Sequence, residues 1–398
     1  MRAMGNREII ELAETCLMPT YARFPVVLVR GRGMRVWDAD GRQYLDFLAG
    51  IAVCSLGHCH PHVTEAIREQ AGRLLHVSNL YHIEPQVRLA RVLVEHTHAD
   101  RVFFCNSGAE ANEAAIKLAR KYHKDQGDPG RHEIVSASMS FHGRTLATLT
   151  ATGQDKVKVG YDPLPQGFSF VPYDDIEALE EAVGPRTAAV LLEPVQGEGG
   201  VRVPGPGYLR AVRELCDARG ALLILDEVQT GVGRTGTFLA SEHEDVRPDL
   251  TTLAKGLGGG VPIGALLATE AVARSFGPGT HASTFGGNPL VTAAALATVR
   301  TILTEGVLDH CRRIGGYLMD RLRELTGQNP TVVEVRGRGL LIGVQLSEDR
   351  RAADLVHEMM DRGFLVGTAG EHVLRLAPPL IVEKEEIDAL LAALGEVL

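Results

Sequence analysis

The sequence predicts an α/β fold with two domains. From Arg101 onward, short apolar segments alternate with helical ones, which is typical of right-handed crossovers and a mostly parallel sheet flanked by helices. Strand-like segments near the N-terminus and a mixed segment near the C-terminus predict a small α+β domain assembled from both ends of the chain. The 398 residues suffice for two such domains.

The individual elements are predicted from apolar periodicity and turn signals. N-terminal strands are expected at 26–29, 34–38 and 44–47, with a turn at 38–41, and helices at 61–75 and 85–95. Further strands are expected at 102–105, 133–135, 188–192 and 221–225, and helices at 109–123 and about 288–305. A last amphipathic helix presents Ile387, Leu390, Leu391, Leu394 and Leu398 on one face. The predicted limits are 1–60 and 288–398 for the two parts of the small domain and 61–287 for the large domain.

The composition restricts the class of partner. A net charge of −9 argues against nucleic acid and against an anionic membrane surface. No apolar segment approaches the ~20 residues of a membrane span, and residues 1–11 lack a signal-peptide pattern. Six cysteines without a CxxC pair are typical of reduced thiols. We therefore expect a cytoplasmic protein that binds small molecules and captures anionic ones with individually placed arginines.

Lys255 and Asp226 are the most informative pair of residues. Asp226 ends the apolar strand 221–225, and Lys255 lies farther along the chain between small residues. Each alone has a common structural role, the lysine on the surface and the aspartate as a helix cap. Together they suit pyridoxal phosphate, because a lysine can form a Schiff base with its aldehyde and an aspartate can keep its pyridine nitrogen protonated. Gln229 would then reach the phenolic oxygen of the cofactor.

A second signal lies where the strand 102–105 meets the following helix. Ser107 and the amide groups of Gly108 and Ala109 fall at the expected helix N-terminus, where free N–H groups and the helix dipole favour a phosphate. Taken alone, Ser107 more often only caps a helix. The lysine and the aspartate favour the phosphate.

Seven motifs occur in order along the chain. They are Gly57–Pro61, Asn106–Glu113, Phe141–Thr145, Glu193–Gly200, Leu225–Gly231, Ala254–Gly256 and Ser283–Pro289. This set resembles the class III (ω-amino) aminotransferases of fold type I over roughly residues 20–395. The resemblance implies a mostly parallel seven-stranded sheet in the large domain, pyridoxal 5'-phosphate as the cofactor, and a homodimer with shared active sites.

The resemblance also implies roles for single residues. Phe141 would stack on the pyridine ring, and Thr284 would reach the phosphate of the neighbouring subunit's cofactor. Ser283 would contact substrate across the same interface. Arg144 would hold the α-carboxylate of N2-acetyl-L-ornithine or the distal carboxylate of 2-oxoglutarate. Arg375 would clamp the α-carboxylate of glutamate and 2-oxoglutarate.

Glu198 answers a difficulty in the implied reaction. One pocket must accept a donor without a carboxylate beside its reacting amine, and then an acceptor that has one. Glu198 would pair with Arg375 when the donor is bound and swing away for 2-oxoglutarate. The implied reaction moves the δ-amino group of N2-acetyl-L-ornithine to 2-oxoglutarate and gives N-acetyl-L-glutamate 5-semialdehyde and L-glutamate, a step of arginine biosynthesis.

The substrate is less sharply defined than the chemistry. Succinylornithine, acetyl-lysine, ornithine and 4-aminobutyrate aminotransferases share most of these motifs. Ile51 stands where ornithine δ-aminotransferases typically have a tyrosine, which leaves room for an N-acyl group. Tyr21, Asn79 and Tyr81 either line the pocket or serve packing and interface contacts.

Two other classes of function differ from this one in the residues that they need. A pyridoxal-phosphate-dependent racemase or aminomutase would keep the lysine and the aspartate but would need no Glu198–Arg375 exchange. A non-catalytic relative would have lost Lys255 or Asp226. A metal site at His58, Cys59, His60 and His62 fits no zinc spacing, so no metal is expected, and these residues should cap the helix that begins at Pro61.

Overall fold

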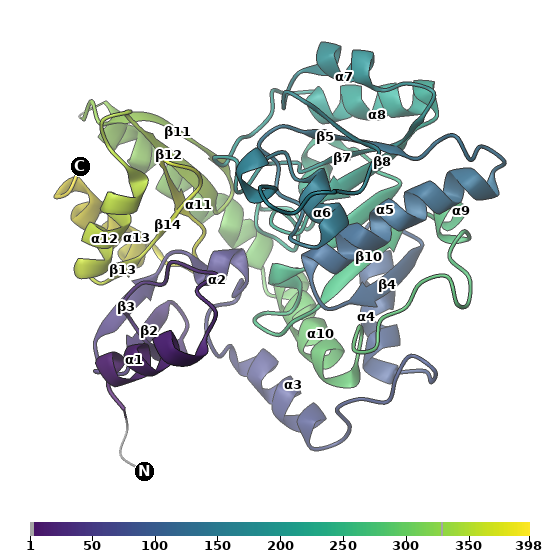
Figure 1. Cartoon of the computed structure of the whole chain (residues 1–398). Helices are drawn as coiled ribbons and strands as arrows, with labels where there is room; N and C mark the ends of the chain where they lie inside the picture. Colours follow the sequence, from purple (N-terminus) through teal and green to yellow (C-terminus); the bar gives the residue numbers. More distant parts are fainter. Residues whose placement is uncertain (1–3, 328) are drawn as a thin grey trace.

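A seven-stranded sheet forms the centre of the larger body in the computed structural model, which describes residues 4–327 and 329–398 (Figure 1). The strand order is β4-β10-β9-β8-β7-β5-β6. The strands are β4 (Arg101–Cys105), β5 (Glu133–Ala137), β6 (Phe168–Val171), β7 (Thr187–Leu192), β8 (Leu222–Asp226), β9 (Leu250–Leu253) and β10 (Gly264–Ala268). Only β10 runs antiparallel to its neighbours, so the predicted mostly parallel seven-stranded sheet is confirmed.

Helices cover both faces of this sheet. They are α5 (Gly108–Asp125), α6 (Leu146–Ala151), α7 (Ile176–Ala182), α8 (Tyr208–Arg219) and α9 (Glu270–Ala273), with short 3-10 turns η1 (Asp155–Val157), η2 (Ala240–Glu244) and η3 (Lys255–Leu257). Alternate strand residues point to opposite faces: Ile134 packs with the alanine-rich face of α5, and Val135 packs with α7 and α8. All residues of β7 and β8 are buried, as expected for strands covered on both sides.

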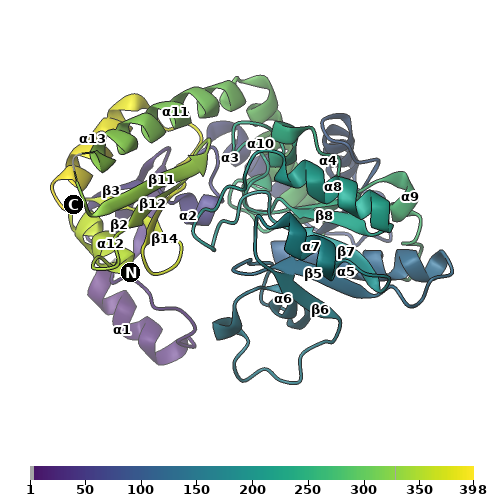
Figure 2. The same ribbon diagram turned by 90° about the horizontal axis from the view of Figure 1, so that it is seen from above.

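The two ends of the chain build the smaller body. One sheet has the order β1-β2-β3-β13 and the other β11-β12-β15-β14. The bounds are β1 (Leu28–Arg32), β2 (Arg35–Asp38), β3 (Gln43–Asp46), β11 (Val332–Arg338), β12 (Leu341–Leu346), β13 (Phe364–Leu365), β14 (Gly367–Thr368) and β15 (Val373–Leu376). The parallel pairing of Phe364 with Leu45 joins the two ends directly. In Figure 2, α11 (Val307–Thr326) and α13 (Lys384–Gly395) lie outside β11 and β12, and α12 (Ala352–Asp361) lies near β14.

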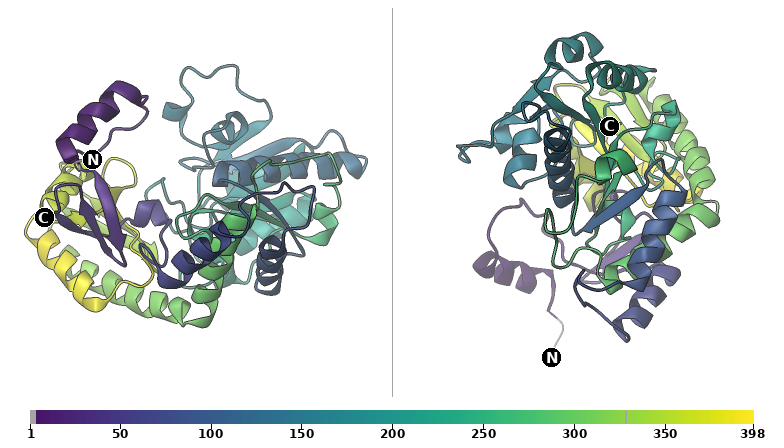
Figure 3. Two further views of the ribbon diagram at one scale, coloured as in Figure 1. Left: turned by 90° about the horizontal axis from the view of Figure 1, so that it is seen from below. Right: turned by 90° about the vertical axis from the view of Figure 1, so that its right-hand side faces the viewer.

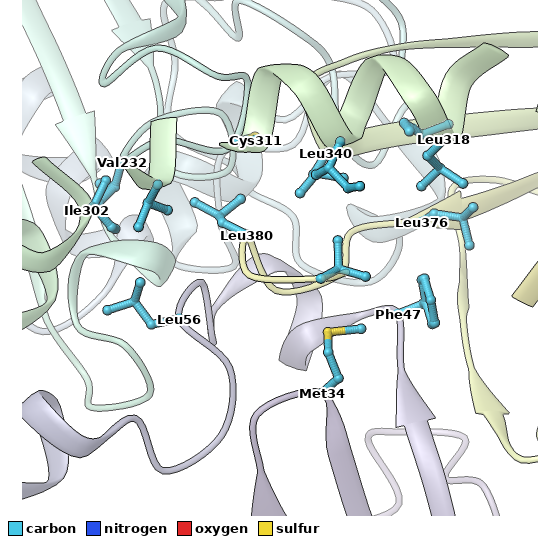
Figure 4. Close-up of a cluster of buried hydrophobic side chains, with 14 of the residues drawn as sticks. Met34, Phe47, Leu56, Val232, Ile302, Cys311, Leu318, Leu340, Leu376 and Leu380 are labelled. Atoms are coloured by element: carbon cyan, nitrogen blue, oxygen red, sulfur yellow. The ribbon is translucent and has the colours of Figure 1, made fainter. Parts of the chain in front are cut away.

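Three helices and a shared core connect the bodies. The helices α3 (Pro61–Ala71), α4 (Glu84–Glu95) and α10 (Pro289–Thr304) pack together, and α10 leads into α11. Figure 4 shows the core running from Ile302 and Val232 through Leu380 and Leu340 to Phe47. The domain limits at 60 and 288 stay predictions. Among the described residues no single helix has the length and hydropathy of a membrane span; only α10 and α11 taken together, bent by 68°, pass that test.

The N-terminal helix α1 (Asn6–Cys16) stands away from the rest of the chain (Figure 3). All its residues are described and none is buried. Its first residue holds it to the β2–β3 turn, because the Asn6 side chain donates to Asp38 at 3.0 Å and its backbone N–H donates to Asp40 at 3.0 Å. The predicted turn at 38–41 is therefore present and also anchors this helix.

The short element α2 (Ala49–Ala52) is a left-handed turn at the junction of the bodies. Ala49, Gly50, Ile51 and Ala52 have φ angles of 52°, 65°, 65° and 61°. A left-handed conformation costs roughly 1–2 kcal/mol for each non-glycine residue. Asp46 stabilises the start of the turn by accepting from the backbone N–H groups of Leu48 at 2.9 Å and Ala49 at 2.8 Å.

Two predictions about local structure are corrected. The first strand spans Leu28–Arg32 and not 26–29. The helix α3 begins at Pro61 as predicted, but within the described structure no histidine side chain caps it. His58 instead pairs with Asp46 at 2.8 Å, and His62 faces Glu305 at 3.1 Å.

Candidate active site

A cavity of about 460 Å³ lies at the carboxyl ends of the parallel strands. Nine of the predicted site residues line it: Ser107, Gly108, Ala109, Phe141, Arg144, Glu198, Asp226, Gln229 and Lys255. They come from the loops that follow β4, β5, β7, β8 and β9. The fold therefore brings together residues that are up to 148 positions apart, from Ser107 to Lys255.

The carboxylate of Asp226 is fixed by three hydrogen bonds. Its Oδ2 accepts from Asn112 Nδ2 at 2.7 Å and lies 2.8 Å from His142 Nδ1, and its Oδ1 accepts from the Val228 backbone at 3.0 Å. Ser136 Oγ lies 3.1 Å from the other ring nitrogen of His142. Asp226 is only 3% exposed. Sequence reasoning did not single out Asn112 or His142, although both lie inside the quoted motifs.

Lys255 opens η3 directly after β9 and lies at the cavity wall. Its φ of 42° is in the left-handed region, so its backbone is held in a strained conformation. Burial lowers the pKa of Lys255, and Arg375 acts in the same direction, while Glu198 and Asp226 oppose it. The lysine is therefore more easily deprotonated than a solvated one.

The start of α5 faces the same cavity. Ser107 Oγ accepts from the Glu110 backbone at 3.2 Å and donates to the Glu110 carboxylate at 3.2 Å, so Ser107 does cap the helix. The N–H groups of Gly108 and Ala109 have no partner within the helix because they belong to its first turn. A Cβ at Gly108 would come within 2.7 Å of Val228, so glycine is required at this close approach. Contact of Ser107 with a phosphate stays a prediction.

Glu198 and Arg375 are paired beside Lys255. Arg375, on β15, is 4% exposed, and its Nη1 donates to Glu198 Oε1. Burial tends to raise the pKa of Glu198, but Arg375 outweighs it and holds the pKa below its usual value. Gln229 joins both: its Nε2 donates to Glu198 at 3.3 Å, and its Oε1 accepts from Arg375 at 3.4 Å. The predicted pair is thus in contact, and Gln229 is a third member that sequence reasoning did not place there.

The two residues expected at an interface lie outside the cavity. Thr284 is exposed. Ser283 Oγ accepts from Asn106 at 3.2 Å and from the Gly286 backbone at 3.0 Å, so it fixes its own loop. Asn79 supports the same loop by donating to the Gly286 carbonyl at 2.9 Å.

Arg144 lies at the site, whereas Ile51, expected to leave room for an N-acyl group, does not line this cavity. Arg144 is exposed at the cavity rim, with its guanidinium 5.6 Å from the ring centre of Phe141. Ile51 and Tyr21 instead line a second, mostly apolar cavity of about 980 Å³ between α1 and the smaller body. Tyr81 is 69% exposed.

Comparison with known proteins agrees with this geometry. The family model described as "Aminotransferase class-III" matches residues 17–398. An acetylornithine aminotransferase from Myxococcus xanthus is 52% identical over 96% of this chain and 95% of its own. The ornithine aminotransferase of Toxoplasma gondii ME49 superposes with a TM-score of 0.95 at 38% identity, covering 99% of this chain and 94% of that one. An N-acetylornithine aminotransferase from Stenotrophomonas maltophilia K279a gives a TM-score of 0.83 at 41% identity, with 97% of both chains covered.

A lysine, a fixed aspartate and a helix N-terminus that line one cavity define a pyridoxal-phosphate-dependent enzyme. The chain belongs to the class-III aminotransferases. Its cofactor is pyridoxal 5'-phosphate, and the donor set fits that group, because the cavity is lined by an amine, a carboxylate held in place by three hydrogen bonds and the N–H groups that begin α5.

Proposed function

We propose that this aminotransferase moves the δ-amino group of N2-acetyl-L-ornithine to 2-oxoglutarate and forms N-acetyl-L-glutamate 5-semialdehyde and L-glutamate. The contact between Glu198 and Arg375 at the lysine cavity carries the proposal. It neutralises the arginine, which suits a donor whose reacting carbon bears no carboxylate. An arginine held by a partly exposed glutamate can be released for an α-carboxylate.

Five groups would hold the cofactor. Asp226 would face the ring nitrogen, Phe141 the ring, Gln229 the phenolic oxygen, Lys255 the aldehyde carbon and the N-terminus of α5 the phosphate. When bound, pyridoxal phosphate supplies an electron sink for the substrate carbon that bears the amine.

Lys255 would carry the proton that the reaction moves. Its lowered pKa favours the neutral amine that can accept a proton from the substrate carbon. The fixed position of Asp226 between Asn112 and His142 would keep a cationic ring nitrogen paired in a dry site. A positioned acid–base group of this kind contributes ~10²–10⁴ in rate.

The two arginines would each bind a different carboxylate of the substrates. Arg375 would hold the α-carboxylate of 2-oxoglutarate once Glu198 has moved away, and Gln229 would stabilise either arrangement because it bonds to both. Arg144 at the rim would hold the carboxylate at the far end of donor or acceptor. Its exposed position leaves its head group accessible to an entering substrate.

N2-acetylornithine is favoured over its relatives by similarity. Relatives named acetylornithine aminotransferase cover nearly the whole chain at 51–54% identity. Ornithine is the second candidate, because the superposition on the Toxoplasma gondii ornithine aminotransferase gives a TM-score of 0.95. Succinylornithine, acetyl-lysine and 4-aminobutyrate are further donors to compare.

We also propose a cytoplasmic homodimer that serves arginine biosynthesis. Two features support a second subunit. Thr284 is exposed in the loop that Ser283 fixes. Leu12 of α1 and Leu17, the residue after this helix, are 56% and 52% exposed to solvent. Thr284 would contact the partner's cofactor phosphate, and Ser283 the substrate.

The test is the visible absorption of the cofactor-loaded protein after N2-acetylornithine is added without a keto acid. Loss of the yellow band, restored by 2-oxoglutarate, is the expected result. If free ornithine or 4-aminobutyrate bleaches the band and N2-acetylornithine does not, the donor assignment is wrong. Conversion of substrate with no need for 2-oxoglutarate would instead indicate a racemase or aminomutase.

A further inference from the structure

Glu193 is a buried carboxylate at the cavity that the proposed reaction does not use. It follows β7, is 5% exposed and lines the cavity with Lys255 and Asp226. Burial is the largest influence on its carboxyl group. A carboxylate in such surroundings is costly unless hydrogen bonds satisfy its oxygens.

Each carboxylate oxygen of Glu193 accepts from a different loop. Oε2 accepts from the backbone N–H of Phe141 at 3.1 Å, and Oε1 accepts from that of Gly197 at 3.2 Å. Phe141 lies in the loop after β5, and Gly197 directly precedes Glu198 in the loop after β7. The backbone of Glu193 is itself fixed, because the Tyr173 hydroxyl donates to its carbonyl at 2.9 Å.

We propose that Glu193 is a positioning residue that holds the ring-facing Phe141 loop and the Glu198 loop in one fixed relation through these two hydrogen bonds. The inference rests on the cofactor and switching roles proposed above for Phe141 and Glu198. The proposal adds a physical link between these two residues. When the Glu198 loop moves, it displaces the carboxylate of Glu193, and this carboxylate also holds the backbone of Phe141.

Both bonds are strongest to the ionised carboxylate. Protonation turns one of its oxygens into a hydroxyl, which is a weaker acceptor, so the hydrogen bond from one of the two N–H groups is weakened. Burial is the main reason why the pKa of Glu193 is raised to about 7; Asp226 acts in the same direction, and His142 and the two backbone N–H groups oppose it. Lys255 and Tyr173 also face this carboxylate. The link is therefore strongest above neutral pH and weakens as the pH falls through about 7.

The variant Glu193→Gln tests the proposal against a matched control, Glu227→Gln. Glu227 is also buried and accepts from two backbone N–H groups, those of Ala240 at 2.7 Å and Ser241 at 2.9 Å, but it lies outside the cavity lining. The first readout is the dissociation constant of pyridoxal phosphate, measured by absorption titration of the apoprotein. The second is the ratio of KM for 2-oxoglutarate to KM for the amino donor.

We expect Glu193→Gln to weaken cofactor binding about tenfold, the effect of losing roughly one hydrogen bond to a charged group. The KM ratio should change as well, whereas Glu227→Gln should change only the melting temperature. If Glu193→Gln fails to fold, Glu193→Asp serves, because it stays ionised but is too short to reach both N–H groups. Equal cofactor affinity and an unchanged KM ratio in the folded variant would overturn the inference. The apoprotein titration needs no substrate, so it decides this inference even if N2-acetylornithine is not the donor.

Discussion

Asp226 is oriented by side chains that are distant in sequence. Asn112 comes from α5 and His142 from the loop after β5, and each contacts the same carboxylate oxygen. Gln229 contacts Glu198 and Arg375, whereas the sequence alone predicts only that it reaches the phenolic oxygen of the cofactor. The residue types thus predict the chemistry of the site, whereas their hydrogen-bond partners depend on how the loops pack against one another.

Replacing Gly197 tests the hydrogen-bonded arrangement of Glu198, Arg375 and Gln229. A Cβ at Gly197 would lie 2.1 Å from Gln229 Oε1, so Gly197→Ala must displace that side chain. We expect KM for 2-oxoglutarate to rise about tenfold, since a hydrogen bond to a charged group is lost. Steady-state kinetics measure it. Gly184→Ala is the control, because no described atom lies within 4 Å of its added Cβ. Equal KM values in both variants would contradict the arrangement.

The buried carboxyl group of Glu227 should make the free energy of unfolding depend on pH. Burial raises its pKa to about 7, above its value in the unfolded chain. The folded state therefore binds the proton more tightly, and the free energy of unfolding falls as the pH rises from about 4.5 to about 7, by at most ~1.4 kcal/mol per pH unit. In Glu227→Gln this decline should be smaller. Urea unfolding at several pH values measures it, and identical slopes for both proteins would refute the prediction.

At the scale of elements, the longer apolar segments were predicted, whereas three short strands of the central sheet were not. The helices at 289–304 and 108–125 and the buried strands β7 and β8 match their apolar runs. The strands β6, β9 and β10 were not predicted, because Phe168–Val171, Leu250–Leu253 and Gly264–Ala268 are four or five residues long and carry little pattern of their own. Their strand conformation comes from pairing with neighbours in the sheet.

The left-handed turn Ala49–Ala52 depends on the His58–Asp46 pair. Hydrogen bonding to Asp46 raises the pKa of His58 to about 10, and the same carboxylate caps the turn. This stabilisation is fully present below about pH 6.5 and is lost as the pH rises through about 10. His58→Gln should therefore destabilise the protein by about 1–2 kcal/mol at pH 7 and by less at pH 10. Thermal unfolding at both pH values tests this.

His60→Gln is the matched control for this prediction. His60 Nδ1 is buried and has no hydrogen-bond partner in the described part of the chain. Its replacement should not reproduce the pH-dependent loss. A difference between wild type and His58→Gln that grows toward pH 10 would contradict the assigned direction.

The whole molecule leaves part of the expected site exposed. Thr284 lies on the surface outside the cavity, although the family motif assigns it to a cofactor phosphate. Two subunits that exchange these residues would account for both facts. In the proposed homodimer, each subunit would thus complete the active site of the other with its Thr284.

Mixed dimers test this arrangement. Lys255→Ala should be inactive, because it loses both the cofactor anchor and the proton carrier. Thr284→Ala should bind the cofactor more weakly. In a dimer of one subunit of each kind, one site lacks both residues and the other is complete, so activity should exceed that of either parent. Co-expression with two affinity tags isolates the mixed dimer, and activity no higher than that of Thr284→Ala alone would show that each subunit uses its own threonine.

The sequence by itself determined the fold class, the cofactor and nine of the residues that line its cavity. It could do so because a lysine can bind the aldehyde of the cofactor, an aspartate can pair with its ring nitrogen and a helix N-terminus can bind its phosphate, and because alternating strands and helices place strand ends at one edge of a sheet. The tertiary structure decided which neighbours fix those residues. Asn112, His142 and Glu193 act through hydrogen bonds, which need a defined distance and angle between the two groups. These are set only when the loops that follow different strands have packed together.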